Sequence, residues 1–273
     1  MSVTEFGYQP DVTEIFRQAS VKGAPASLNM HYFKAKGAGP SPVLVWLHSG
    51  GFRTGRISHK NHRALARWLT ASNISVAFPE YRLNSLREDL ETTIQQGMDA
   101  LEGYAHPDFP ENFRGAAAMA ALEDTIAFLS WFEARRDQYE FSGPIVLGGS
   151  SAGAITALNV AYLAPLLGMT SQKLGGVISC SGGYAYSLRP NVVSPPVLAI
   201  HNPEDNRVPS QPIIDLANED SAVSLLLSEE NDHGSWNLSR TEPRRKAFGR
   251  LIGTIRQFSG VDSEQVAQSI GKP

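Results

Sequence analysis

Residues 144–157 of the chain read PIVLGGSSAGAITA, and this stretch decides how the rest can fold. Its first part is a run of β-branched and leucine residues typical of a buried strand, and its last part is rich in alanine and predicts a helix. A corner of glycine and serine joins the two. Because the corner has so few bulky side chains, the backbone can bend sharply there and neighbouring segments can approach it closely. The stretch therefore predicts a strand, a tight turn and a helix in direct succession.

The corner contains the pattern Gly-x-Ser-x-Gly from Gly149 to Gly153, which places Ser151 at its centre. A serine hydroxyl is a weak nucleophile unless it projects from a tight bend toward a base, and such a bend imposes strained dihedral angles on the serine. Ser151 is therefore the candidate nucleophile. The alternative frame, centred on Ser150, is weaker because it puts Ala152 where the second glycine should be. The interpretation without catalysis is a glycine-rich turn that cradles an anion.

The composition limits the class of protein. The chain has 273 residues, a net charge of −3 and 42% hydrophobic residues, which is enough for a sizeable core in one domain, 1–273. No basic stripe is evident, which argues against nucleic acid or an anionic membrane as the main partner. Cys180 is the only cysteine, so neither an internal disulfide nor a cysteine-based metal site is expected. Residues 1–10 do not resemble a signal peptide, and no apolar run approaches the ~18 residues of a membrane span, so we expect a cytoplasmic protein.

A glycine-containing loop follows the buried strand that we predict over residues 42–47. The loop reads HSGGFRTG, residues 48–55. Acyl transfer needs backbone N–H donors aimed at the oxyanion that develops on the substrate, and glycine allows the backbone to come that close. We expect Gly50 and Gly51 to supply two donors of an oxyanion hole. Ala152, at the N-terminus of the helix that follows the nucleophile, is the expected third donor.

Two later loops carry the candidate acid and base. Residues 202–209 read NPEDNRVP, and the carboxylate of Asp205 can accept a hydrogen bond from an imidazole and stabilise the imidazolium. Glu204 is the alternative acid. His233 follows the last predicted strand, in a loop from which its ring can reach both Ser151 and Asp205. The interpretations without catalysis are a helix-capping turn for the acid and a surface position for the histidine.

Taken together, these segments resemble the α/β-hydrolase superfamily, and within it the esterase/lipase branch that includes hormone-sensitive-lipase-like and feruloyl-esterase-like bacterial carboxylesterases. The resemblance covers residues 40–83 and 116–258. Loop 48–55 is similar to the HGGG-type oxyanion loop, with serine in place of the first glycine. Residues 201–209 are similar to the segment HGxxDxxVP, with asparagine in place of glycine, and residues 80–84 are similar to the start of DYRLAPE. The order of nucleophile, acid and base along the chain is also that of this family.

The resemblance implies an α/β fold in which an eight-stranded, mostly parallel sheet has helices on both faces and the site at the carboxyl ends of the strands. It also implies a serine carboxylesterase that hydrolyses small or medium esters through an acyl-enzyme on Ser151, without a metal or cofactor. The expected partner is a small-molecule ester. Three alternatives stay open: an amidase or peptidase, an acyltransferase on the same triad, and a non-catalytic ligand receptor built on a hydrolase scaffold.

Two segments near the expected site differ from many members of the family. Residues 84–114 are an insertion, which can act as a lid or pack on the surface. Residues 182–194 form a short loop where many relatives carry a cap. Candidate substrate contacts are Phe52, Ser150 and Tyr184.

Several other residues are expected to have structural roles. A buried arginine can brace loops through its forked donors, and a buried cysteine usually acts as a small apolar residue. We therefore assign structural roles to His48, Arg82, Cys180 and His201.

Overall fold

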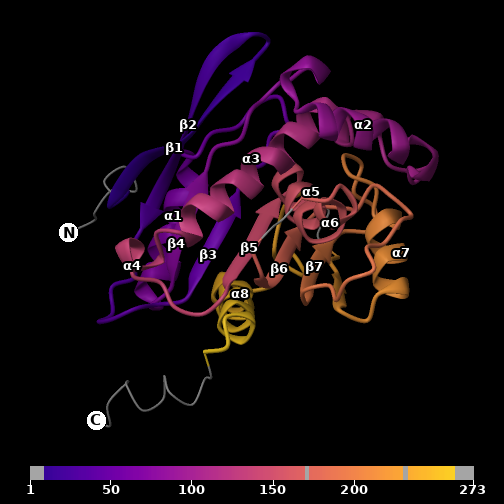
Figure 1. The fold of residues 1–273 in the computed structure, drawn as a ribbon. Helices are drawn as coiled ribbons and strands as arrows, with labels where there is room; N and C mark the ends of the chain where they lie inside the picture. Colours follow the sequence, from indigo (N-terminus) through magenta and orange to yellow (C-terminus); the bar gives the residue numbers. More distant parts are fainter. Residues whose placement is uncertain (1–8, 170–171, 230–232, 262–273) are drawn as a thin grey trace, which may run out of the picture.

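The computed structural model describes residues 9–169, 172–229 and 233–261. Its strands form one eight-stranded sheet in the order β1-β2-β4-β3-β5-β6-β7-β8 (Figure 1). The strands are β1 (Val12–Val21), β2 (Ala24–Phe33), β3 (Val43–Leu47), β4 (Ser75–Pro79), β5 (Ile145–Ser150), β6 (Leu174–Cys180), β7 (Val197–His201) and β8 (Val223–Leu227). The α-helices are α1 (Lys60–Ala71), α2 (Thr92–Leu101), α3 (Ala116–Glu133), α4 (Arg136–Tyr139), α5 (Ala152–Leu158), α6 (Ala164–Leu166), α7 (Gln211–Glu219) and α8 (Arg244–Phe258). Among the residues so described, no helix is long and apolar enough to span a bilayer.

Most of the sheet is parallel. The strands β4, β3, β5, β6, β7 and β8 pair in parallel, whereas β2 pairs antiparallel with both β1 and β4. Every residue of β3, β4 and β7 is buried. This is the pattern of short apolar strands covered by helices on both faces. The eight-stranded, mostly parallel sheet expected from the sequence is confirmed.

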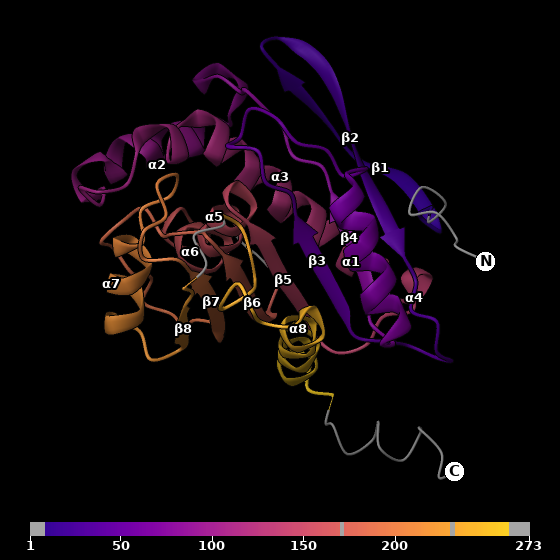
Figure 2. The same ribbon diagram turned by 180° about the vertical axis from the view of Figure 1, so that it is seen from behind.

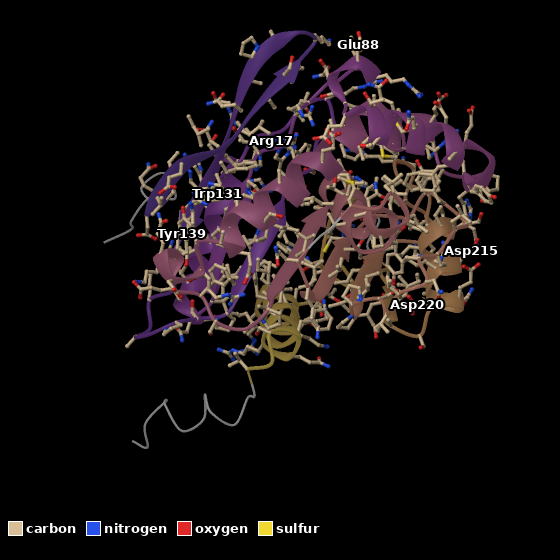
Figure 3. The ribbon with its side chains drawn as sticks, viewed as in Figure 1. Arg17, Glu88, Trp131, Tyr139, Asp215 and Asp220 are labelled. Atoms are coloured by element: carbon tan, nitrogen blue, oxygen red, sulfur yellow. The ribbon has the colours of Figure 1, made fainter. Side chains whose placement is uncertain are left out.

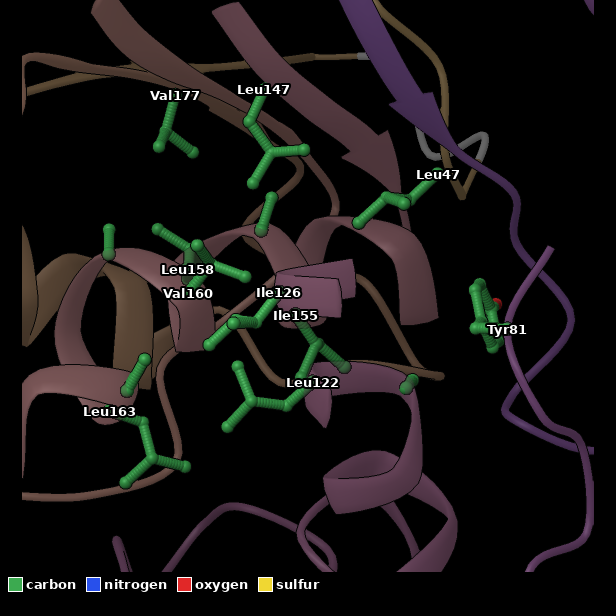
Figure 4. Close-up of a cluster of buried hydrophobic side chains, with 14 of the residues drawn as sticks. Leu47, Tyr81, Leu122, Ile126, Leu147, Ile155, Leu158, Val160, Leu163 and Val177 are labelled. Atoms are coloured by element: carbon green, nitrogen blue, oxygen red, sulfur yellow. The ribbon is translucent and has the colours of Figure 1, made fainter. Parts of the chain in front are cut away.

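The two faces of the sheet have separate apolar cores. On one face α3 and α5 lie against the strands, and their side chains Ile126 and Ile155 belong to the same buried cluster (Figures 1 and 4). On the other face α1 and α8 cover the strands and contribute Leu65 and Leu251 to a second cluster (Figure 2). The site at the ends of the strands therefore lies between two independently packed layers.

The outer hairpin is fastened to the helix layer by a polar and an aromatic contact. Arg17 of β1 forms an ion pair with the buried Asp124 of α3, at 2.8 Å between Nη1 and Oδ1. Tyr32 of β2 packs ring to ring against Tyr139 of α4, with their centroids 4.9 Å apart. Figure 3 shows Arg17, Trp131 and Tyr139 on the side of the molecule that carries β1. These contacts hold the antiparallel edge of the sheet against α3 and α4.

The insertion over residues 84–114 contains α2 and three short 3₁₀ turns. It lies at the end of the molecule toward which β3 and β5 point (Figures 1 and 2). Its backbone pairs with the loop over residues 182–194, through hydrogen bonds from His106 N–H to Ala185 C=O at 2.8 Å and from Ser187 N–H to Tyr104 C=O at 2.9 Å. The two irregular segments therefore form one connected layer. A lid function for this layer stays a prediction.

The helix that follows Ser151 changes type along its length. α5 ends at Leu158, and a π-helical turn, Asn159–Leu163, separates it from α6. Pro165 explains the change, because proline has no N–H to donate to the carbonyl of Ala161 and its ring crowds that carbonyl. The regular helix is therefore short, and only its first turn bears on the site.

Candidate active site

Ser151 occupies the bend between β5 and α5 in a strained conformation, with φ of 54° and ψ of −119°. Positive φ is costly for a residue with a side chain and persists only where the surroundings enforce it. Gly149 and Gly153 make the bend possible. A Cβ on Gly149 would lie 2.3 Å from the carbonyl carbon of Gly153, and a Cβ on Gly153 would lie 2.2 Å from the carbonyl oxygen of Leu47. Both glycines are therefore required for the close approach of α5 to β5 and β3.

The structure brings Ser151, His233 and Asp205 together from the loops that follow β5, β8 and β7. The His233 ring lies between the other two residues, with Nε2 2.8 Å from the Ser151 Oγ and Nδ1 2.6 Å from Asp205 Oδ2. The Asp205 side chain is 1% exposed, whereas the His233 side chain is 14% exposed. A buried carboxylate that accepts from Nδ1 fixes the tautomer in which Nε2 can take a proton from the serine hydroxyl.

Asp205 is held as a carboxylate. Burial opposes ionisation, but the hydrogen bond from His233 and the backbone N–H groups of Arg207 and Val208 outweigh it and lower the pKa of Asp205. The two backbone donors lie 2.9 and 3.1 Å from Oδ1. Glu204, the alternative acid, is exposed and makes no contact with His233 among the described residues. The acid beside the imidazole is therefore Asp205.

The backbone next to His233 is hydrogen-bonded to residues near Ser151. The N–H of Gly234 donates to Ser181 Oγ at 2.9 Å, and the Ser150 hydroxyl donates to the carbonyl of Gly234 at 3.3 Å. Gly234 has φ of 83°, and a Cβ there would lie 2.5 Å from Ser150 Oγ. These contacts fix the position of the imidazole relative to the serine.

An ion pair holds the loop that follows His233 against α8; we call this loop, residues 233–243, the base loop. Arg250 of α8 donates from Nη1 and Nη2 to the two carboxylate oxygens of Glu242, each at 2.8 Å, and from Nη2 to the carbonyl of Trp236 at 2.8 Å. The hydrogen bonds from Arg250 lower the pKa of Glu242 to about 2. A bidentate pair of this kind fixes geometry as well as charge. Sequence reasoning missed it, because no local pattern links positions 242 and 250 to the loop.

The loop after β3 bends at two adjacent glycines, and their role as oxyanion-hole donors stays a prediction. Gly50 and Gly51 have φ of 128° and 61°, and a Cβ on Gly50 would lie 1.9 Å from the carbonyl oxygen of Thr54. In the described parts of the chain, no hydrogen bond uses the N–H of either glycine. Ala152, the first residue of α5, presents its N–H at the helix N-terminus.

His48 and Tyr81 hold this loop in place. The His48 Nδ1 donates to the carbonyl of Ser49 at 2.8 Å, and the Tyr81 hydroxyl donates to the carbonyl of His48 at 2.7 Å. The two rings stack with centroids 4.1 Å apart. Burial lowers the pKa of His48. The contribution of Tyr81 to the loop could not be found from the sequence, because it depends on how two loops meet.

Two of the three expected substrate contacts differ from the prediction. Phe52 is fully buried and packs against Tyr81 and Phe113, so its ring belongs to the core. Tyr184 is 1% exposed and packs against Tyr162. In both cases the physical reason is that a large aromatic ring on an irregular loop is most stable when it is buried.

Ser150, the third expected substrate contact, is half-buried and lines a pocket beside the turn that carries Ser151.

The residues expected to be structural are all buried. His201 lies with Nδ1 3.0 Å from the carbonyl of Gly182 and Nε2 3.0 Å from the carbonyl of Val208, so it joins the acid loop to the end of β6. Burial raises the pKa of the Cys180 thiol to about 12, which leaves little reactive thiolate. Over the described residues, no cluster of three or more histidine, cysteine or carboxylate side chains is arranged to hold a metal ion.

Comparison with known proteins places this geometry on a known scaffold. No family model matches the chain. Gut esterase 1 of Caenorhabditis elegans is 27% identical over 189 residues, which is 63% of this chain. The chain spans about a third of the length of that curated relative.

Solved structures are similar over nearly the whole chain. Native esterase Est2 of Thermogutta terrifontis has a TM-score of 0.64 at 15% identity and covers 94% of this chain and 96% of its own. An esterase of Pyrobaculum calidifontis has a TM-score of 0.60 at 15% identity and covers 93% of this chain and 87% of its own. With the sheet order and the strand-turn-helix elbow, these similarities show that the chain has the α/β-hydrolase fold.

Proposed function

We propose that the protein is a serine carboxylesterase that hydrolyses small or medium esters. The observation that carries this proposal is the position of His233, whose two ring nitrogens lie within hydrogen-bond distance of Ser151 and Asp205. A nucleophile, a base in contact with it and a third group that orients the base are the parts that acyl transfer needs. The partner is a small-molecule ester.

The residues define the steps of the reaction. His233 Nε2 takes the proton of the Ser151 hydroxyl as Oγ bonds to the ester carbonyl carbon. The N–H groups of Gly50, Gly51 and Ala152 stabilise the resulting oxyanion, and donors of this kind are worth about 3–4 kcal/mol each in related chemistry. The carbon–oxygen bond to the alcohol then breaks, and His233 gives its proton to the departing alcohol oxygen.

Water completes the cycle. His233 removes a proton from a water molecule, whose oxygen attacks the acyl carbon on Ser151. The bond to Ser151 Oγ then breaks, the serine regains its proton from His233, and the carboxylic acid leaves. No other reactant is required, so the balance is one ester and one water giving one acid and one alcohol.

The similar proteins support the same chemistry without establishing it for this chain. The relatives in the comparison are named as esterases, and the Thermogutta enzyme has been solved in a form phosphonylated by cyclosarin. An acyltransferase on the same triad would differ in preferring an alcohol to water as acceptor. A cytoplasmic location remains a prediction.

The test is hydrolysis of p-nitrophenyl acetate and p-nitrophenyl butyrate by the wild-type protein and by Ser151→Ala. We expect kcat to fall at least about 10⁴-fold in Ser151→Ala, because the nucleophile is removed. Ser221→Ala is the matched control, since Ser221 is exposed in the turn before β8. Equal rates for the wild type and Ser151→Ala would refute the proposal.

A further inference from the structure

A hollow lies beside the proposed active site. Its volume is about 460 Å³, and it lies between the loop after β3, the start of α1 and the loop that follows His233. The aromatic rings of Trp46 and Trp236, with centroids 5.1 Å apart, and the side chain of Leu65 supply its apolar lining. Polar groups from the loop and α1 line the remainder. The hollow is large enough for a small ring with one or two substituents.

The position of this pocket relates it to the leaving group. Ser150, directly before the nucleophile, and Gly234, directly after the base, both line it, as does Gly50 of the oxyanion loop. In the first half of the reaction, the alcohol oxygen must approach His233 to receive its proton. An ester whose alcohol portion extends from His233 past Gly234 would therefore reach this pocket.

Among the described residues that line the pocket, the permanent charge is that of Arg56. Arg56 lines it and is exposed, and it makes no ion pair with any of the described residues. Among the residues that the structure describes, no aspartate or glutamate lines the pocket. The surrounding segment, residues 49–67, contains five arginine or lysine residues and no acidic residue, although the whole chain has a net charge of −3.

The buried histidines of the pocket do not add to this charge. Burial lowers the pKa of His62 to about 4, so its ring is neutral near pH 7. Its Nδ1 donates to the carbonyl of Ile57 at 3.1 Å. Arg56 therefore carries the permanent charge among the described residues of the pocket, and its guanidinium can pair with an anion placed there.

We propose that this pocket holds the alcohol portion of the ester and selects alcohols that carry an anionic group, with Arg56 as its charge partner. The inference rests on the proposed esterase function and names the substrate class of that site. The flat faces of Trp46 and Trp236 suit an aromatic alcohol. The products are then a carboxylic acid and a hydroxylated acid.

The test compares two acetate esters that differ in charge and little in shape: 3-carboxyphenyl acetate and 3-carbamoylphenyl acetate. For Arg56→Gln we expect kcat/KM for the carboxylate ester to fall about tenfold, with kcat/KM for the amide ester changed less than about twofold. Arg67→Gln is the matched control, because it removes the same charge from an exposed position of α1 that does not line the pocket. It should leave the ratio of the two kcat/KM values unchanged.

Other results would overturn the inference. An equal effect of Arg56→Gln on both esters would show that the arginine does not read the charge of the alcohol. If Arg67→Gln changed the ratio of the two kcat/KM values as much as Arg56→Gln does, the preference would come from the general field of the basic segment and not from Arg56. A preference that follows the acyl group, measured with p-nitrophenyl hydrogen succinate against p-nitrophenyl succinamate, would assign the pocket to the acid portion.

The esterase proposal and this inference fail in different ways. If the wild type hydrolyses neither acetate, or if Ser151→Ala hydrolyses both at the wild-type rate, the esterase proposal falls and the inference falls with it. If the wild type hydrolyses both through Ser151 and no variant changes the ratio, the esterase proposal stands and only the inference falls.

Discussion

Two buried clusters of charged and polar side chains differ in whether they contain a group that can exchange a proton with a substrate. In one, His233 joins Ser151 to Asp205 at the ends of the strands. In the other, Arg82 donates from Nε to both oxygens of Asp124 at 2.9–3.0 Å and also contacts Glu123. Both clusters contain a nearly inaccessible carboxylate.

The second cluster has its charges paired. Asp124 also accepts from the backbone N–H of Arg82 at 2.8 Å and from Arg17, while Arg82 donates to the carbonyl of Asp89 at 2.7 Å. The first cluster ends instead in a serine hydroxyl with a strained backbone and a partly exposed imidazole. Burial of charge therefore does not identify a reactive site by itself. A reactive site also needs a group that can exchange a proton with a substrate.

Among the variants that test this comparison of the two clusters, the largest effect is expected from Asp205→Asn. The amide can still accept the backbone hydrogen bonds of Arg207 and Val208, but it no longer holds the His233 tautomer or stabilises the imidazolium. We expect kcat for p-nitrophenyl acetate to fall about 10³- to 10⁴-fold. The urea midpoint should change little. A variant that keeps more than a tenth of wild-type kcat would place Asp205 outside the mechanism and remove the contrast between the clusters.

The next effect concerns stability and tests the paired cluster. Asp124→Asn leaves Arg82 and Arg17 without their shared carboxylate inside the protein. We expect the free energy of unfolding, measured with urea, to fall by about 3 kcal/mol. The kcat of the folded fraction should stay within about twofold of the wild type. The control is Asp108→Asn, which alters an exposed carboxylate. A loss of kcat without a loss of stability would contradict a structural role for this cluster.

The smallest effect comes from the ion pair that closes the base loop, and it depends on pH. The pKa of Glu242 is lowered to about 2, below its ordinary 4.5, so its carboxylate stabilises the folded state fully above about pH 4.5. This contribution is lost as the pH falls toward about 2. Glu242→Gln should therefore lower the urea midpoint at pH 7, and the difference from the wild type should shrink by pH 3. A difference as large at pH 3 as at pH 7 would contradict this linkage.

Much of the fold and of the site chemistry could be predicted because it is encoded locally. Continuous apolar runs predicted the buried parallel strands, and the Gly-x-Ser-x-Gly corner predicted the strained turn at Ser151. Loops after parallel strands meet at one edge of the sheet, so Asp205 and His233 could be placed near the serine from their order alone. The distances between these side chains came only from the structure.

Features that depend on how loops meet could not be predicted. Phe52 and Tyr184 are directed into the core by neighbouring rings, and neither direction is encoded in the loop itself. The pairing of residues 84–114 with residues 182–194 joins segments about 80 positions apart. The basic segment over residues 49–67 was not identified from the sequence, because its five charges are spread among uncharged residues, and it was recognised only beside the pocket that it borders.

The most direct test of the account is covalent labelling with a fluorophosphonate, followed by peptide mass mapping. An activated serine hydroxyl attacks the phosphorus and displaces fluoride, and the account predicts one adduct per chain, on Ser151. The wild type should label rapidly, and His233→Ala and Asp205→Asn should label far more slowly. An adduct on Ser150, or no adduct on a folded wild-type protein, would contradict the claim that His233 activates Ser151.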